Sequence, residues 1–372
     1  MLIRKNIEGL LDKAGIKVNG SSPWDIKVHD DRLFARVARE KNLGLGEAYM
    51  DGWWDCERLD EFFFRLLDAR LDEKMGNCFN EMFLRLWSVF SNRQSRKRAY
   101  QIAERHYNLD NDLFLSFLDS YNQYSCGFFE NTDDLEQAQK KKMEMICRKL
   151  NLQSARNVLD IGCGWGGFAK YAAEKYGCHV TGVNIAREQI QYAREQCRGL
   201  PVEILEKDYR ELEGKFDRIV SIGMFEHVGP KNYRDFIDSV LECLHPEGCF
   251  LLHTIGGNKS ERNADPWISK YIFPNGVLPS MTQISRTTEG SLVMEDWHNL
   301  GPHYDRTLMS WNDRFQKAWP DLKKKYSEGF RRMWEYYLLS CAGAFRARSI
   351  QVWQIVFTRG CKEQPPCRCV ID

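Results

Sequence analysis

Four glycines, at positions 162, 164, 166 and 167, follow the hydrophobic run Val158–Ile161 and could hold a ligand against the main chain. Glycine has no Cβ, so a turn rich in glycine lets the backbone come very close to a bound molecule. Dinucleotide-binding proteins need G-x-G-x-x-G with an acidic residue about 20 positions further on, whereas this chain has G-x-G-x-G. The spacing therefore favours S-adenosylmethionine (SAM) over the dinucleotide of a dehydrogenase. A tight structural turn is the remaining alternative.

The segment predicted to bind SAM starts in the last residues of the buried strand and includes the glycine turn. Asp160 closes the strand, where its carboxylate could accept a hydrogen bond from an amine. The whole stretch predicted to bind SAM is Leu159, Asp160, Ile161, Gly162, Cys163, Gly164, Trp165, Gly166 and Gly167.

Two further segments could contact the adenosine part of SAM. Asp208 follows a predicted strand, so its carboxylate could accept the adenine amino hydrogen and Tyr209 could pack beside the ring. The alternative is an ordinary turn, because aspartate favours turns. Where SAM enzymes usually carry an acidic residue for the ribose, this chain has Asn184 and Gln189. Either Gln189 substitutes for that acid, or Asn184 only caps the next helix.

Two groups could do acid–base chemistry. Glu226 lies just past a predicted strand and could hold a substrate or orient a base. The alternative is an acidic residue that favours a helix N-terminus. His253 ends another predicted core strand at the same edge, a position that favours function over packing. His227 is adjacent to Glu226 in sequence and cannot face the same point, so we expect it to pack behind the site.

Two cysteines are weaker candidates. Cys126, in Gln123-Tyr124-Ser125-Cys126, is either a hydrogen-bonding thiol or a buried apolar one. Cys341 could be a nucleophile, but nothing near it in sequence would lower its pKa. Packing within a helix is therefore the preferred interpretation.

Alternating elements must position these residues. Strands are predicted at 157–161, 179–183, 202–206, 216–222 and 249–255, with helices between them and one before them at 135–150. This βαβ rhythm predicts a mostly parallel sheet, and ligands of such sheets bind beyond the carboxyl ends of the strands. The candidate residues lie just past those ends.

The rest of the chain is assigned by composition and pattern. Residues 1–80 are predicted to form a small α-rich N-terminal domain, with a helix ending near Gly20, a strand at 24–28 and helical segments over 31–70 interrupted at Gly44–Gly46. Residues 81–100 are predicted to be a connector. Residues 101–372 form the catalytic domain, with proline and aromatic residues marking an inserted cap over about 260–330.

Composition excludes several classes. The net charge is +1, which gives no argument for nucleic acid. Thirteen cysteines without a paired framework, and no signal-peptide pattern, predict a reducing cytoplasm. No segment is long and apolar enough to span a membrane. Cys361, Cys367 and Cys369 lack standard zinc spacing, and no metal site is expected.

Taken together, these motifs resemble the cyclopropane-fatty-acyl-phospholipid synthases from about residue 10 to residue 360. The resemblance is carried by segments 44–54, 123–126, 159–167, 224–229, 265–274 and 342–346. It implies a class I, Rossmann-like SAM-methyltransferase sheet with a helical cap, and an enzyme that adds a methylene across the cis double bond of phospholipid acyl chains. Asn184 and Ala186 depart from the hydroxyl residues that relatives often carry, which puts the ribose contacts in doubt.

The resemblance also implies site residues. It implies a bicarbonate ion as general base, held by Cys126, Glu226, His253, Tyr304 and the backbone of Ile255. It adds Tyr124 and Ser125 to the SAM contacts and names Cys341 as an active-site residue. No thioester forms in such a reaction, so a nucleophile role for Cys341 is not expected.

A phospholipid substrate implies partners. We expect transient contact with the inner face of the membrane, through the first helix with its Arg4 and Lys5 or through the basic-aromatic stretch 82–98. The alternative is that both segments pack between domains. The resemblance suggests a homodimer. The rival functions are a methyltransferase of the same fold giving a methyl-branched lipid, an alcohol or a methylated amine, and a lipid-binding protein with a vestigial SAM fold.

Overall fold

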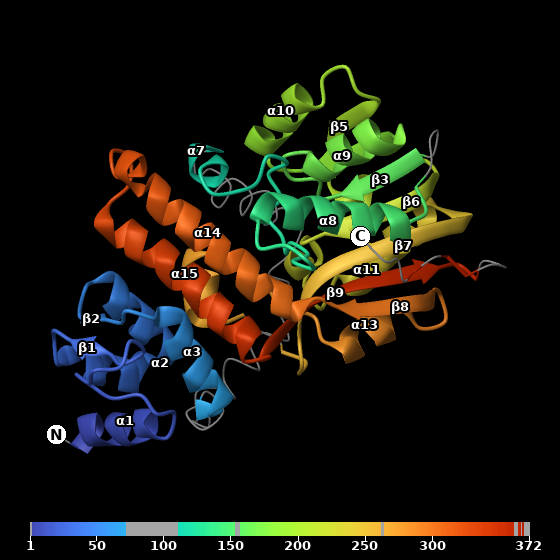
Figure 1. Ribbon diagram of the computed structural model, residues 1–372. Helices are drawn as coiled ribbons and strands as arrows, with labels where there is room; N and C mark the ends of the chain where they lie inside the picture. The colour runs from blue at the N-terminus through green and yellow to red at the C-terminus, as the bar shows by residue number, and fades with distance from the viewer. Residues whose placement is uncertain are drawn as a thin grey trace. The chain divides into compact units, whose positions relative to one another are not determined.

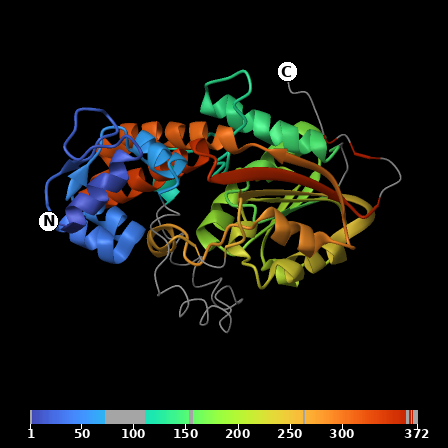
Figure 2. The same cartoon turned by 90° about the horizontal axis from the view of Figure 1, so that it is seen from below.

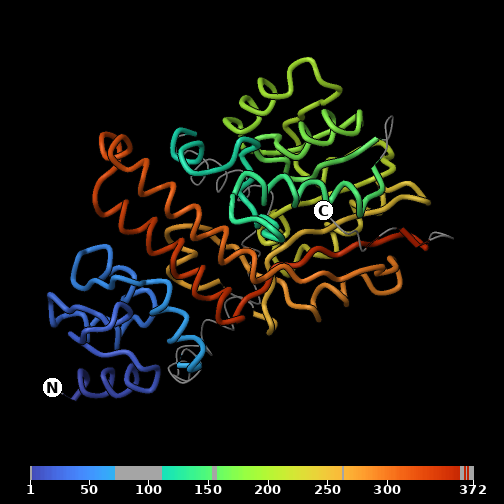
Figure 3. Tube along the Cα trace, viewed as in Figure 1, coloured from blue at the N-terminus to red at the C-terminus, as the bar shows by residue number. Residues whose placement is uncertain are grey.

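A computed structural model of the chain describes residues 2–71, 111–152, 157–261 and 264–360, together with residues 364, 365 and 367. The chain forms two compact units (Figure 1). Unit 1 combines Met1–Ser91, Asn263–Pro274 and Tyr304–Ile350, and unit 2 combines Asn92–Arg262, Asn275–His303 and Gln351–Asp372. Each unit is therefore assembled from three separate stretches of sequence, as the chain trace in Figure 3 shows.

Unit 2 is built on a seven-stranded sheet in the order β5-β4-β3-β6-β7-β9-β8 (Figure 1). The strands from β3 to β7 pair in parallel, and β8 pairs with β9 antiparallel. The chain order reverses between β3 and β6, which is where such sheets bind ligands. The bounds are β3 Asn157–Ile161, β4 His179–Asn184, β5 Val202–Glu206, β6 Phe216–Ile222, β7 Leu244–Gly257, β8 Val293–Asn299 and β9 Ile350–Thr358.

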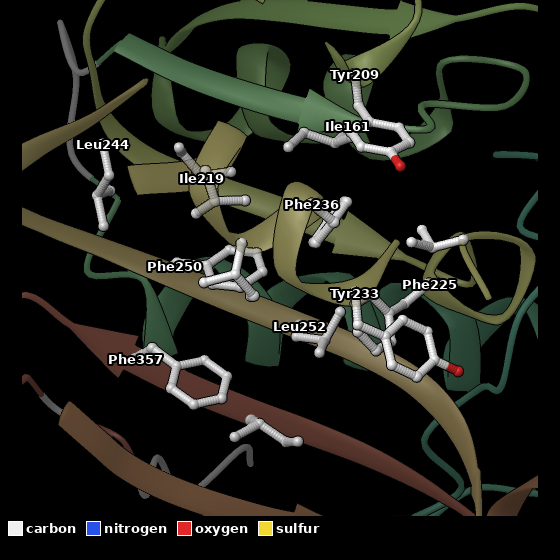
Figure 4. Close-up of a cluster of buried hydrophobic side chains, with 14 of the residues drawn as sticks. Ile161, Tyr209, Ile219, Phe225, Tyr233, Phe236, Leu244, Phe250, Leu252 and Phe357 are labelled. Atoms are coloured by element: carbon white, nitrogen blue, oxygen red, sulfur yellow. The ribbon is translucent and has the colours of Figure 1, made fainter. Parts of the chain in front are cut away.

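Alternate residues of the central strands face opposite layers, as the twofold period of a strand requires. Val220 and Leu251 pack with helices α8 (Leu135–Lys149) and α9 (Gly167–Tyr176). Their neighbours Ile219 and Phe250 pack on the other face with α11 (Tyr233–Cys243) and α13 (Met281–Thr288). Figure 4 shows this second core, and Figure 2 shows the helices on the two faces of the sheet.

The remaining elements of unit 2 connect its strands or precede them. Helix α10 (Arg187–Gln196) follows β4, and Ile190 and Ala193 pack it against Cys163 and Ile204. Short helices follow β5 and β6 as η1 (Tyr209–Glu211) and η2 (Phe225–His227), and α7 spans Asn111–Leu115.

Unit 1 is mainly helical. Helix α15 packs on α2 and α3, and α12 packs on α2. Tyr336 lies at the centre of this core, with ring centroids 5.6 Å from Tyr49, 5.1 Å from Phe63 and 4.5 Å from Trp267. The elements are α1 Leu2–Asp12, β1 Lys27–Val28, α2 Arg32–Met50, β2 Trp54–Asp55, α3 Leu59–Asp68, α12 Pro266–Tyr271, α14 Gly301–Leu322 and α15 Glu328–Arg346. The first three residues of α14 belong to unit 2.

Gly343 sets how closely α15 approaches α3. A Cβ at this position would lie 2.6 Å from the Asp60 carbonyl oxygen and 2.7 Å from Phe63 Cβ. We expect Gly343→Ala to lower the free energy of unfolding by about 1–3 kcal/mol, because one helix must shift away from the other. Urea unfolding followed by circular dichroism measures this loss.

The matched control for Gly343→Ala is Gly329→Ala on the same helix, where a Cβ meets only Ser327 Oγ at 3.8 Å. Equal unfolding midpoints for the two variants would contradict the packing argument.

Most strand predictions are confirmed, and several boundaries are corrected. Strands β3, β5 and β6 match their predicted ranges. Helix α2 continues through Gly44 and Gly46 and instead has its non-helical residue at Lys41. The glycines serve close packing, since a Cβ on Gly46 would lie 2.4 Å from Trp267. The first helix ends at Asp12, not near Gly20.

The range predicted as a cap, 260–330, is divided between the two units. Strand β8 belongs to the sheet of unit 2, whereas α12 and most of α14 belong to unit 1. Strand β9 was not predicted, β7 is longer than 249–255, and the strand predicted at 24–28 is limited to β1. The predicted connector 81–100 lies outside the described residues.

Candidate active site

The glycine turn follows β3 at the point where the sheet order reverses. Gly162, Gly164 and Gly166 have φ values of 85°, 54° and 81°, in the left-handed region that favours glycine. The Gly162 and Cys163 amides both donate to the Val183 carbonyl, at 2.9 and 3.1 Å, which ties the turn to β4. The turn therefore has the backbone conformation that its glycines predict.

Asp160 is buried beneath this turn, with 2 % of its surface exposed. Burial raises the pKa of its carboxyl to about 7, and the positive charge of Lys142 opposes this rise. A cationic ligand group near Asp160 would favour the ionised form in the same way. The position suits the α-ammonium group of SAM.

The segment that contains Tyr124, Ser125 and Cys126 is held from below by α8. Lys142, fully buried, donates from Nζ to Gln123 Oε1 at 2.6 Å and to Ser125 Oγ at 2.9 Å. Gln139 Nε2 donates to the Ser125 carbonyl at 2.8 Å. Side chains of one helix thus fix the backbone and side chains of the predicted SAM segment.

Aromatic rings connect this segment to the glycine turn. The ring centroid of Phe114, on α7 three residues after Asn111, lies 5.2 Å from that of Tyr124 and 5.0 Å from that of Trp165. Trp165 Nε1 donates to Asn111 Oδ1 at 2.9 Å. Tyr124 and Trp165, predicted from separate motifs, therefore share a neighbour.

The residues after β4 bind one another. Asn184 Nδ2 donates to Gln189 Oε1 at 2.9 Å, and Asn184 Oδ1 accepts from the amides of Ile185 and Ala186. Asn184 thus shapes the loop before α10, although the helix N-cap itself is Ala186. A ribose contact through either side chain stays a prediction.

The predictions for Asp208 and Tyr209 are altered by the structure. Asp208 forms a capping box with Glu211, and its two carboxylate oxygens accept from Arg210 at 2.7 and 2.8 Å. Tyr209, labelled in Figure 4, lies in the core and does not stand free to cover an adenine. Its ring centroid is 5.3 Å from that of Phe236. The structure favours the turn interpretation of Asp208.

Glu226 and Ile255 are joined directly. The Ile255 amide donates to Glu226 Oε1 at 2.6 Å, so its single N–H is used by the carboxylate and acts on the site through Glu226. A direct contact of the Ile255 backbone with an anion stays a prediction. Burial raises the pKa of Glu226 to about 7, and the hydrogen bond from Ile255 opposes the rise.

Glu226 and His253 each present an unused polar atom. Gly223, just after β6, donates its amide to the His253 carbonyl at 2.9 Å, so His253 lies beside the end of β6 although β7 itself continues to Gly257. Glu226 Oε2 and His253 Nε2 are buried and have no hydrogen-bond partner among the residues that the structure describes. Buried polar atoms of this kind usually have partners, so the pair points to a polar ligand.

The other predicted residues are distributed over both units. Cys126 is fully buried, and its thiol contacts the carbonyl oxygens of Gly127 at 3.2 Å and Leu300 at 3.9 Å. Tyr304 and Cys341 belong to unit 1. Burial raises the pKa of Cys341 to about 12, which argues against a thiolate nucleophile.

Comparison with known proteins decides the family. Residues 94–355 match the family model described as mycolic acid cyclopropane synthetase. The chain belongs to this family. It is 55% identical over 351 residues to the cyclopropane-fatty-acyl-phospholipid synthase of Escherichia coli K12, covering 94% of this chain and 92% of that protein.

Other members of the family extend the likeness. The tuberculostearic acid methyltransferase UfaA1 of Mycobacterium tuberculosis is 32% identical, over 90% of this chain and 82% of that protein. The crystal structure of mycolic acid cyclopropane synthase CmaA1 complexed with SAH and CTAB superposes with a TM-score of 0.65 at 31% identity, covering 69% of this chain and 97% of that one. The predicted family, class I SAM-methyltransferase fold and enzyme class are confirmed.

Two buried lysines of α8 were not predicted from the sequence. Lys142 and Lys149 are seven residues apart, on the face that also buries Ala138, Met145 and Ile146. Lys149 Nζ lies 3.6 Å from Asp296 Oδ2 and 3.1 Å from His298 Nδ1, and both of these residues are on β8. The available signal was the placement of two lysines on the apolar stripe of an amphipathic helix.

We expect Lys142→Met to weaken SAM binding on the order of 10-fold, because hydrogen bonds from a charged group to Gln123 and Ser125 are lost. Burial lowers the pKa of Lys142 to about 8, so the wild-type side chain is mostly charged at pH 7. Without that charge the pKa of Asp160 would rise further, which weakens its attraction for an ammonium group. Titration calorimetry with SAM measures the change.

The matched control for Lys142→Met is Lys141→Met. Lys141 is the neighbouring residue and donates to the Glu130 carbonyl in an exposed position. Equal SAM affinity in the two variants would rule out a role for the hydrogen bonds of Lys142 in SAM binding.

Proposed function

We propose that this protein transfers a methylene group from SAM across the cis double bond of acyl chains in membrane phospholipids, giving cyclopropane fatty acids and S-adenosylhomocysteine. Family membership and the 55% identity to the Escherichia coli synthase support this reaction. The observation that carries it is in unit 2, where the glycine turn follows β3. The unpaired polar atoms belong to Glu226, just past the end of the adjacent strand β6, and to His253, opposite that end on β7.

We further propose that Glu226 and His253 hold bicarbonate. The fit rests on the two unpartnered atoms, because bicarbonate has one O–H that a carboxylate can accept and other oxygens that an imidazole N–H can bind. When bound, bicarbonate supplies a small base for the proton that the reaction releases. Cys126 and Tyr304 remain predicted contacts of the same ion.

The reaction balances without an oxidant. When bound, SAM supplies an electrophilic methyl group, which forms a bond with the π electrons of the alkene while the S–C bond electrons stay on sulfur. The acyl chain then carries a cation and an added CH₃. Loss of one methyl proton closes the ring, so the net gain is CH₂.

The described residues have three tasks in this reaction. The glycine turn and the Tyr124–Ser125 segment hold the donor in place, which can contribute several kcal/mol by positioning alone. The carboxyl of Glu226 orients the base. Burial of Glu226 and His253, at 7 % and 1 % exposure, limits water that would trap the cation as an alcohol.

An incubation with purified protein tests the proposal. SAM and vesicles of unsaturated phospholipid should give acyl chains heavier by about 14 daltons that resist mild hydrogenation. Vesicles of saturated phospholipid are the control and should remain unchanged. The absence of a mass gain on unsaturated chains would contradict the proposed function. An unchanged rate in bicarbonate-depleted buffer would contradict the proposed role of bicarbonate as the base.

A methyl-branched product is a second candidate, favoured by the likeness to tuberculostearic acid methyltransferase. Loss of the proton from a neighbouring carbon would leave an alkene, which takes up hydrogen under mild conditions, whereas capture by water would add about 32 daltons. The same mass spectra therefore separate the candidates.

We also propose that the protein acts as a peripheral membrane protein in the cytoplasm, as a homodimer. In support, Leu2 and Ile3 of α1 are 76 % and 48 % exposed beside Arg4 and Lys5, a pattern that suits an anionic lipid surface. The basic-aromatic stretch 82–98 lies outside the described residues. No helix in the described part of the chain could cross a bilayer. Vesicle co-sedimentation and analytical ultracentrifugation test the two statements, and a monomer that stays in the supernatant would contradict both.

A further inference from the structure

A row of buried polar side chains crosses the sheet on the face covered by α8. His253 on β7 and Gln354 on β9 share this face with Val356, whereas Trp353 and Ile355 face the other core. Gln354 pairs in register with His298 on β8. The row brings Gln354, about 100 residues further along the chain, to the proposed catalytic site.

Gln354 contacts the histidine ring directly. Its Nε2 lies 3.3 Å from His253 Nδ1, and both side chains are buried, with 0 % and 1 % exposure. With the amide nitrogen as donor, Nδ1 is the acceptor and the ring proton must lie on Nε2. Burial and the charges of Lys142 and Lys149 lower the pKa of His253 well below its ordinary value, so the ring is neutral.

The opposite amide orientation fits the site poorly. It would place the ring proton on Nδ1 and leave a lone pair on His253 Nε2. That lone pair and Glu226 Oε2 would then both face an anion with no proton to offer. The orientation with Nε2–H gives the site one donor and one acceptor, which matches bicarbonate.

We propose that Gln354 is a positioning residue that fixes the Nε2–H tautomer of His253 and so presents a hydrogen-bond donor to the bound anion. The proposal rests on the proposed function for the identity of that anion. Packing alone does not explain the residue, since Gln354 Oε1 is buried without a partner among the described residues, and an apolar side chain would avoid that penalty.

The experiment compares Gln354→Leu with Gln351→Leu. Gln351 is a buried glutamine on the same strand that faces away from His253 and accepts from Asn299 Nδ2 at 3.1 Å. For Gln354→Leu we expect the bicarbonate concentration that gives half-maximal rate to rise roughly 10-fold to 100-fold, with SAM affinity unchanged. Gln351→Leu should resemble the wild type. An unchanged bicarbonate requirement in Gln354→Leu would overturn the proposal.

The tautomer itself is read by two-bond ¹H–¹⁵N correlation spectra of histidine-labelled protein, with the His253 signal assigned from His253→Gln. The wild type should show the proton on Nε2, and a wild-type ring protonated on Nδ1 would overturn the proposal. If Gln354→Leu does not fold, Gln354→Glu serves instead. Its carboxylate accepts from Nδ1–H and should move the proton, so an unchanged Nε2–H ring would count against Gln354.

The two readouts separate the two proposals. The spectra need neither lipid nor bicarbonate, so they decide the role of Gln354 on the ring in any case. A wild-type protein that makes no cyclopropane, or whose rate ignores bicarbonate, would instead overturn the proposed function.

Discussion

Glu226→Gln should reduce cyclopropane formation roughly 100-fold to 10,000-fold while SAM still binds. The amide oxygen of glutamine can keep the hydrogen bond from the Ile255 amide, so the local fold is retained. Its NH₂ group would replace the unpaired acceptor Oε2 by a donor, which cannot take the O–H of bicarbonate. Turnover on phospholipid vesicles and calorimetry with SAM measure the two effects separately.

Glu226→Gln should lower activity but raise the stability of the folded protein at alkaline pH. Burial raises the pKa of Glu226 in the folded protein to about 7, above its ordinary value of 4.5. The stability contributed by the protonated form is complete below about pH 4.5 and is lost as the pH rises through 7. Glu226→Gln stays neutral, so at pH 8 it should be more stable than the wild type by about 3 kcal/mol, and at pH 4 it should be equal.

The control for Glu226→Gln is Glu247→Gln, an exposed carboxylate on the same strand as Ile255, which should keep its activity. Full turnover in Glu226→Gln would refute the catalytic role. Loss of both SAM binding and stability at pH 8 would show that the activity was lost by misfolding.

Gly167→Ala should have the next largest effect. A Cβ at Gly167 would lie 1.7 Å from the Tyr121 carbonyl oxygen and 2.5 Å from Gln123 Nε2. Either the start of α9 or the segment leading to Tyr124 and Ser125 must move. We expect turnover to fall on the order of 100-fold, because displacements near 1 Å have such effects, and the free energy of unfolding to fall by about 1–3 kcal/mol.

Initial rates and urea unfolding check the prediction for Gly167→Ala, with Gly329→Ala as the control in open surroundings. A variant with wild-type kinetics would show that the two segments can separate without disturbing the SAM site.

The central strands β3 and β6 could be predicted because most of their residues are buried and each strand ends just before a glycine. The edge strand β5 has only Ile204 fully buried, and it was recognised from its short apolar positions between acidic residues. The predicted bounds of all three strands match the structure. The proximity of Glu226 and His253 followed from the same pattern, since parallel strands present their carboxyl ends at one edge, although β7 continues beyond His253 to Gly257.

Strand β8 could not be recognised in this way. Its sequence Val293–Asn299 carries the buried Asp296 and the half-buried His298 on one face, and both approach Lys149 on a helix about 150 residues earlier. The alternation of polar and apolar residues fails because these polar groups lie close together inside the protein. The contacts of Gln354 with His253 and of Arg210 with Asp208 were missed because sequence spacing does not show which buried polar groups meet.

The three-part construction of unit 1 has a consequence for synthesis on the ribosome. Helices α2 and α3 are made early, within the first 70 residues, yet the helix that they pack against, α15, begins only at Glu328. About 260 residues separate the end of α3 from that start. Translation at about 5–20 residues per second leaves roughly 13–52 s between the synthesis of α3, which carries Phe62 and Phe63, and the start of α15. The nascent chain therefore exposes an apolar surface while the residues of the sheet are translated. A chaperone can bind that surface during this interval.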